Sequence, residues 1–129
     1  AAVSEVSAVA EVRELALELQ RRTVATELCS GRGVILEGRD IGSTVLPNAE
    51  VKFFLTADPS ARAARRGLET GQEVSEVIEL IKARDLADST REQSPLRKAE
   101  DAIEIDATHL SADEVVEVMH SRILDVASL

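Results

Sequence analysis

Three groups of charged residues in this sequence could bind a phosphorylated ligand. The first is Gly38-Arg39-Asp40, which follows the apolar run 33–36 after Glu37. The planar guanidinium of Arg39 could hold a phosphate by two parallel hydrogen bonds, and Asp40 could accept from an amino group or orient a cation. An exposed loop with a local Arg–Asp pair is the simpler interpretation, and for this tripeptide alone it is the favoured one.

The second group is Arg84, Asp88 and Arg91, spaced i, i+4 and i+7. On a helix this spacing forms one row, beside the apolar stripe of the same segment. A carboxylate between two guanidiniums suits a ligand with hydroxyls and a phosphate, although an exposed ion-pair row worth under about 1 kcal/mol is the simpler alternative. The third group lies in the preceding segment and consists of Arg62, Arg65 and Arg66. By itself such a basic group is typical of a solvated helix face.

The helices that must position these groups are expected in four places. Apolar residues at helical spacing predict a helix over residues 3–22, in one or two pieces. Asp58 is expected to cap a helix that Pro59 begins, and Ser111 with Glu114 forms a capping box at the start of the last helix. The remaining helix reaches to about residue 91 and carries an apolar stripe of Val74, Val77, Ile78 and Ile81.

Strands are expected at 33–36, 51–57 and 102–107, where short β-branched, aromatic or alternating runs occur. The element order α-β-β-α-α-β-α predicts an α/β protein with a three-strand parallel sheet and flanking helices. Ligands of such sheets bind outside the carboxyl ends of the strands, which is where Arg39 and Asp40 lie. This position favours a functional role for the first charged group.

Length and composition restrict the class of protein. With 129 residues the chain is expected to form a single domain over 1–129. A net charge of -9 and the absence of Trp and Tyr argue against nucleic acid as a partner. No run is long and apolar enough for a membrane span, and the lone Cys29 fits a reducing cytoplasm. His109 and His120 have no ligand neighbours at metal-binding spacing, so no metal site is expected on this chain.

Taken together and in this order, the motifs closely resemble the bacterial cytidylate kinases, or CMP kinases, of the nucleoside monophosphate kinase family. The resemblance covers nearly the whole chain and is carried by "GRDIGSTVLPNAEVKFFLTADPSARAARR", "IKARDLADSTREQSPL" and "AEDAIEIDATHLSADEVV". Its most specific parts are Gly-Arg-Asp-x-Gly and Arg-Asp-x-x-Asp-Ser-x-Arg followed by Ser-Pro-Leu. The resemblance implies a P-loop nucleoside-kinase-like, three-layer α/β fold with a parallel sheet.

The resemblance also implies where the nucleoside would bind. Ser4, Arg13 and Asp40 match positions that read the cytosine ring and its neighbourhood. Arg84 and Asp88 match positions that bind the ribose, with Ser4 assisting. The roles of Arg13 and Ser4 rest on the resemblance alone.

The phosphate-handling residues are implied in the same way. Arg39 and Arg91 match positions that hold the acceptor phosphate, and Arg62, Arg65 and Arg66 lie in the lid helix that closes over the phosphates. The expected catalytic residues are therefore Arg39 and the three lid arginines. The implied reaction is transfer of the γ-phosphoryl group of ATP to CMP or dCMP, with Mg²⁺ and arginines stabilising the transition state and no side chain acting as general base.

One part of the family pattern is missing. Family members begin with a strand, a phosphate loop G-x-x-x-x-G-K-[ST] and a helix, and none of the six glycines here belongs to such a loop. In the family fold the missing strand lies between the strands that match 33–36 and 51–57. Its loop would provide most of the contacts to ATP and Mg²⁺. The fold is therefore expected to be incomplete, and the chain to be inactive without the missing N-terminal part as partner.

A second class of function stays open. The chain could be a noncatalytic nucleotide-binding or protein-interaction module derived from such a kinase. A pure interaction module has no need of Arg84, Asp88 and Arg91 at this spacing together with Arg39 and Asp40. The kinase hypothesis is therefore preferred.

Overall fold

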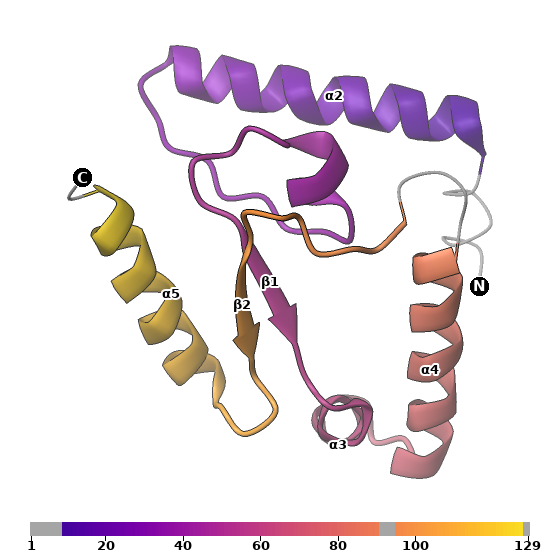
Figure 1. The fold of residues 1–129 in the computed structure, drawn as a ribbon. Helices are drawn as coiled ribbons and strands as arrows, with labels where there is room; N and C mark the ends of the chain where they lie inside the picture. The colour runs from indigo at the N-terminus through magenta and orange to yellow at the C-terminus, as the bar shows by residue number, and fades with distance from the viewer. Residues whose placement is uncertain (1–8, 91–94, 128–129) are drawn as a thin grey trace.

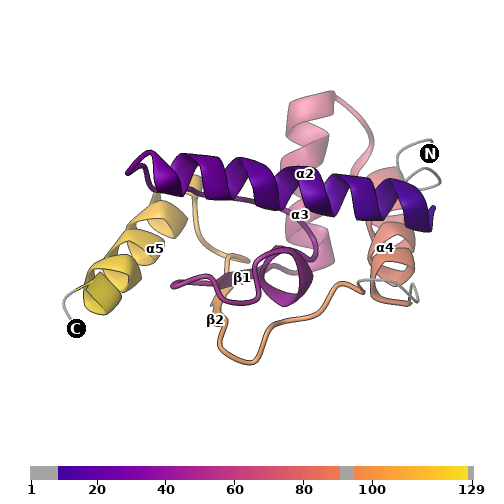
Figure 2. The same ribbon diagram turned by 90° about the horizontal axis from the view of Figure 1, so that it is seen from above.

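The computed structural model describes residues 9–90 and 95–127. Its elements are α2 (Ala10–Cys29), the π-helical turn η1 (Ile41–Val45), β1 (Phe53–Thr56), α3 (Pro59–Thr70), α4 (Val74–Thr90), β2 (Ile103–Asp106) and α5 (Ala112–Ala127). β1 and β2 pair in parallel, with Phe53 opposite Ile103. The sheet lies between α5 on one side and α3 with α4 on the other, and α2 crosses above η1 (Figures 1 and 2). The α/β class with parallel strands is confirmed.

The expected third strand does not form. Residues 33–36 have no strand geometry, and Ile35 is 93% exposed, so the sheet of the described residues has two strands. A strand is stabilised by the neighbours that satisfy its backbone groups. In the fold implied by the resemblance, the neighbour of 33–36 is the strand of the phosphate loop, which this sequence does not contain. The prediction of a three-strand sheet was wrong because residues 33–36 have no pairing partner.

Helix α2 is longer at its C-terminal end than the sequence predicted. It continues from residue 22 to Cys29. The hydroxyl groups of Thr23 and Thr26 donate to the carbonyl oxygens one turn back, at 2.9 Å each, so these residues satisfy their polar groups within the helix. The chain turns away at Gly31, whose φ of 74° is accessible to glycine at little cost. Of the predicted range 3–22, residues 3–8 lie outside the described residues.

The other helix termini follow the predicted capping residues. The Asp58 carboxylate accepts from the backbone N–H of Ser60 at 2.8 Å and caps α3, which ends at Gly71 with φ of 70°. Ser111 and Glu114 form the reciprocal capping box of α5, at 2.8 Å and 3.3 Å. Hydrogen bonds from the Ser60 hydroxyl and backbone N–H lower the pKa of the Asp58 carboxyl, and those from the Ser111 backbone N–H and hydroxyl lower the pKa of the Glu114 carboxyl. Local sequence signals are sufficient to set these boundaries.

Few apolar side chains are buried, and they come from α2, η1, α3, α4, β2 and the residue after it. Ala63 is fully buried against α4, Val77 is 2% exposed, and Ile105 is 5% exposed. Many large apolar side chains are nevertheless more than half exposed, among them Leu55, Leu68, Leu80, Leu86, Val116 and Leu124. None of the helices in the described ranges is long and apolar enough to cross a membrane.

Candidate functional site

The loop that carries Arg39 and Asp40 is fixed by the turn that follows it. The backbone N–H of Val45 donates to the carbonyl oxygen of Asp40 at 3.2 Å, which gives η1 its π-helical geometry, a form frequent at functional sites. Val45 is 3% exposed, and Arg21 of α2 donates from Nε to its carbonyl oxygen at 2.9 Å. The turn therefore holds both charged residues in defined positions.

Asp40 faces α2. Its carboxylate forms an ion pair with the guanidinium of Arg13, and the two side chains are only 14% and 19% exposed. Two of the three residues expected to read the cytosine ring are thus in contact. The third, Ser4, lies outside the described residues.

Arg39 faces α4 instead. Its Nε lies 3.2 Å from Oδ2 of Asp88, and its Nη1 lies 3.5 Å from Oδ1 of Asp85. Arg84 reaches the same Asp88 oxygen at 3.8 Å, although its side chain is 60% exposed. The expected phosphate residue and both expected ribose residues are therefore neighbours, while Arg91 lies outside the described residues.

The lid helix contributes Arg62 to the same place. Its Nη2 donates to Oδ2 of Asp85 at 2.6 Å, and its Nε donates to the carbonyl oxygen of Ala57 at 3.1 Å. The hydrogen bond from Arg62 is the main cause that lowers the pKa of Asp85, helped by the charges of Arg62 and Arg39, while desolvation opposes it. We call the following residues the charge cluster: Arg39, Arg62, Arg84, Asp85 and Asp88.

The other two lid arginines lie apart from the charge cluster. Arg65 donates from Nη2 to the carbonyl oxygens of Ala107, Thr108 and Leu110, at 3.2 Å for Thr108 and 3.1 Å for Leu110. It therefore stabilises the connection between β2 and α5 in this conformation. Arg66 is exposed on α3.

Asp85 is a member of the charge cluster that the sequence analysis missed. Its side chain is 29% exposed, because the buried stripe of α4 continues from Ile81 to Asp85 and Asp88, at i+4 and i+7. Arg84 lies next to this stripe and mostly faces solvent. The spacing from Ile81 was the available signal, and it places Asp85 on the inner face.

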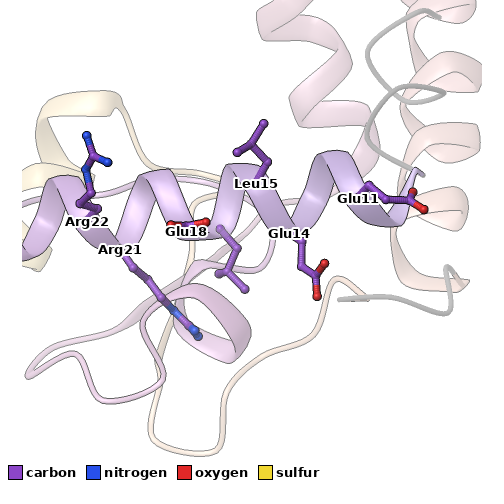
Figure 3. Close-up of a pocket in the computed structure, with 7 residues that line it drawn as sticks. Glu11, Glu14, Leu15, Glu18, Arg21 and Arg22 are labelled. Carbon is purple, nitrogen blue, oxygen red and sulfur yellow. The ribbon is translucent and has the colours of Figure 1, made fainter.

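A separate hollow runs along α2 (Figure 3). It is lined by Glu11, Glu14, Leu15, Leu17, Glu18, Arg21 and Arg22, all from one helix. Three of these residues are carboxylates, which would repel a nucleotide phosphate. The hollow shares no residue with the charge cluster, so it is not a candidate phosphate site.

The charge cluster does not fit a magnesium ion. Within the described ranges, no group of three or more His, Cys, Asp or Glu side chains could hold a metal. Mg²⁺ prefers carboxylate and water oxygens, whereas Asp85 and Asp88 both pair with arginines.

The parallel two-strand sheet and its flanking helices define an α/β protein, and the charge cluster lies in it as a group of ion-paired arginines and aspartates. The family model described as "Cytidylate kinase" matches residues 1–124 of the chain. The chain therefore belongs to the cytidylate kinase family.

Individual relatives agree with the family model. The chain is 53% identical over 116 residues to the cytidylate kinase of Streptomyces griseus subsp. griseus, covering 89% of the chain and 49% of the relative. It is 51% identical over 119 residues to the cytidylate kinase of Lactobacillus johnsonii, covering 88% and 50%, and 47% identical over 120 residues to that of Cytophaga hutchinsonii, covering 89% and 49%. The chain spans about half the length of the curated relatives it matches.

Proposed function

We propose that this chain supplies the acceptor-binding and lid residues of an enzyme that phosphorylates CMP and dCMP with ATP. The observation that carries the proposal is the convergence of Arg39, Arg62 and Asp88 in the charge cluster, from the loop before η1, from α3 and from α4. The resemblance gives these residues roles toward the phosphate, the lid and the ribose. Contact between residues so far apart in sequence is what one shared ligand would require.

Each proposed role follows from the chemistry of the side chain. Asp40, with Arg13, would face the exocyclic amino group of cytosine, which donates to a carboxylate. Asp88 would accept from ribose hydroxyls beside Arg84. Arg39 would bind the acceptor phosphate by its planar fork, and no general base is needed because the acceptor is already an anion.

The lid residues would complete the site. Arg62 already lies in the charge cluster, whereas Arg65 would have to release the carbonyl oxygens of Ala107, Thr108 and Leu110 to reach a phosphate. Arg66 is exposed and could approach from the same helix. Guanidiniums in these positions would offset the negative charge of the phosphates during transfer.

The proposed partner is the P-loop part of the same kind of enzyme, acting in the cytoplasm. That part would hold most of ATP and its Mg²⁺, and the described residues offer no group of side chains that could hold a metal ion. The exposed side chains of Ile35 and Leu55, at 93% and 53%, flank the position where the phosphate-loop strand would lie. Pairing there would cover both side chains and satisfy the free edge of β1.

The test is a complementation assay. The 129-residue chain is incubated with ATP, Mg²⁺ and CMP, alone and with a purified polypeptide comprising the N-terminal half of the Streptomyces griseus cytidylate kinase. We expect CDP only from the mixture. A mixture whose P-loop lysine is replaced by alanine is the matched control and should give none.

Two outcomes would contradict the proposal. Formation of CDP by the chain alone would refute the need for the P-loop part. A stable, CMP-binding complex that never forms CDP would instead favour the noncatalytic module.

A further inference from the structure

Asp85 bridges two arginines that come from different elements. Its Oδ1 lies 3.5 Å from Nη1 of Arg39, and its Oδ2 accepts from Nη2 of Arg62 at 2.6 Å. The carboxylate thus contacts the acceptor loop with one oxygen and the lid helix with the other. Asp88, the other carboxylate of the charge cluster, pairs with Arg39 and Arg84.

Each of the two guanidiniums is held at a second point. Nε of Arg39 contacts Asp88 at 3.2 Å, and Nε of Arg62 donates to the carbonyl oxygen of Ala57 at 3.1 Å. A guanidinium has five N–H donors, so both retain donors for a further anion after these contacts. The two cations are therefore oriented before any ligand arrives.

The net charge of the cluster suits a phosphate ligand. Three arginines against Asp85 and Asp88 leave one net positive charge. Without a carboxylate between them, Arg39 and Arg62 would repel each other and lose their common orientation. The lowered pKa of Asp85 keeps it ionised at neutral pH, as this role requires.

We propose that Asp85 is a positioning residue of the acceptor-phosphate site, holding the guanidiniums of Arg39 and Arg62 together so that one phosphate meets both. The inference rests on the proposed function and concerns a residue to which the resemblance gives no role. The competing explanation is that Asp85 merely ties α3 to α4. A structural tie would affect all ligands alike, whereas a positioning residue acts only on ligands that carry the phosphate.

The experiment compares CMP with cytidine, which lacks the phosphate. Both are titrated into the 129-residue chain and into Asp85→Asn by isothermal calorimetry. We expect Asp85→Asn to raise the Kd for CMP about tenfold, the usual order for a lost charge-assisted hydrogen bond, and to leave the Kd for cytidine unchanged.

Three variants serve as comparisons. Asp85→Glu keeps the charge and should recover most of the CMP affinity. Arg62→Gln removes the same ion pair from α3, and should cause the same selective loss. Glu79→Gln is the matched control, because Glu79 pairs only with the exposed Lys82 of the same helix in the described contacts, at 3.1 Å, and should change neither Kd.

The outcomes separate the two proposals. An unchanged Kd for CMP in Asp85→Asn, or equal weakening of CMP and cytidine, overturns the inference and leaves the proposed function standing. Failure of the wild-type chain to bind either ligand overturns the inference, while the proposed function is judged by the complementation assay. Unfolding of Asp85→Asn, seen by circular dichroism, also overturns the inference, because a part-exposed ion pair should contribute little to stability.

Discussion

The segment 33–36 and the charge cluster differ in one respect: the chain supplies the contacting residues of the cluster, but no strand that pairs with the segment. The segment 33–36 has the composition of a buried strand, yet Ile35 is 93% exposed. The charge cluster begins three residues later, at Arg39, and is assembled from three elements of the same chain. The difference teaches that neither composition nor charge decides order by itself. The cluster forms because α3 and α4 supply its members, and residues 33–36 pair with neither strand of the two-strand sheet.

The largest expected effect comes from introducing a charge at two isoleucines that both belong to predicted strands. Ile105→Asp would bury an unpaired carboxylate and should cost at least about 3 kcal/mol, enough to unfold the chain. Ile35→Asp should change stability by no more than about 0.5 kcal/mol, since the side chain already faces solvent. Urea denaturation gives the free energy of unfolding of both variants. A similar loss of stability in the two would contradict the difference between buried Ile105 and exposed Ile35.

The unpaired segment should respond to the missing neighbour. Backbone amides of 33–36 should exchange rapidly in the chain alone and at least about tenfold more slowly when the P-loop polypeptide is added, because local opening would then require strand separation. Amides of α5 provide the internal control. Hydrogen exchange followed by mass spectrometry measures these rates in the chain alone and in the mixture. Equally fast exchange of 33–36 in both samples would refute strand pairing at this edge.

The assembled cluster predicts a smaller effect at Asp88. Asp88→Ala should raise the Kd for both CMP and cytidine by about tenfold, because its proposed partner is the ribose common to both. Glu76→Ala, an exposed acidic change on the same helix, is the control. Calorimetric titration gives both constants. If Asp88→Ala weakened the binding of CMP and left that of cytidine unchanged, Asp88 would have to be assigned to the phosphate instead of the ribose.

The smallest effect concerns acid stability. The pKa of Asp85 is lowered from its ordinary value of 3.8 by the hydrogen bond from Arg62. A carboxyl whose folded pKa is lowered stabilises the folded state above its unfolded pKa, and this contribution is lost as pH falls through the folded value. Replacing Asp85 by Asn should therefore flatten the decline in melting temperature below about pH 4. If the melting temperature of the variant, measured by circular dichroism, fell below pH 4 as steeply as that of the wild type, the ion pair would add nothing to stability.

Local signals accounted for much of the fold. The Asp58 cap and the Ser111–Glu114 capping box were predictable because each depends on residues close together in sequence. β1 and β2 were predicted within two residues of their ends. Such features carry their own partners within a few residues.

The remainder depended on tertiary partners. Residues 33–36 had strand composition and no neighbour to pair with. The position of Arg65 depends on carbonyl oxygens of Ala107, Thr108 and Leu110, more than forty residues along the chain, as the separations of 42 to 45 show. Asp85 was missed because the predicted row took Arg84 from that turn, whereas the part-buried stripe runs from Ile81 to Asp85 and Asp88.

The central claim is that CMP binds at the charge cluster, and guanidinium NMR tests it directly. The Nε–H resonances of Arg39 on the cluster and of Arg122 on α5, paired there with Asp125 at 3.7 Å, are followed as CMP is added to the chain. We predict a saturable shift of the Arg39 resonance, a weaker response to cytidine, and no change at Arg122. An unmoved Arg39, or equal shifts at both arginines, would contradict the claim.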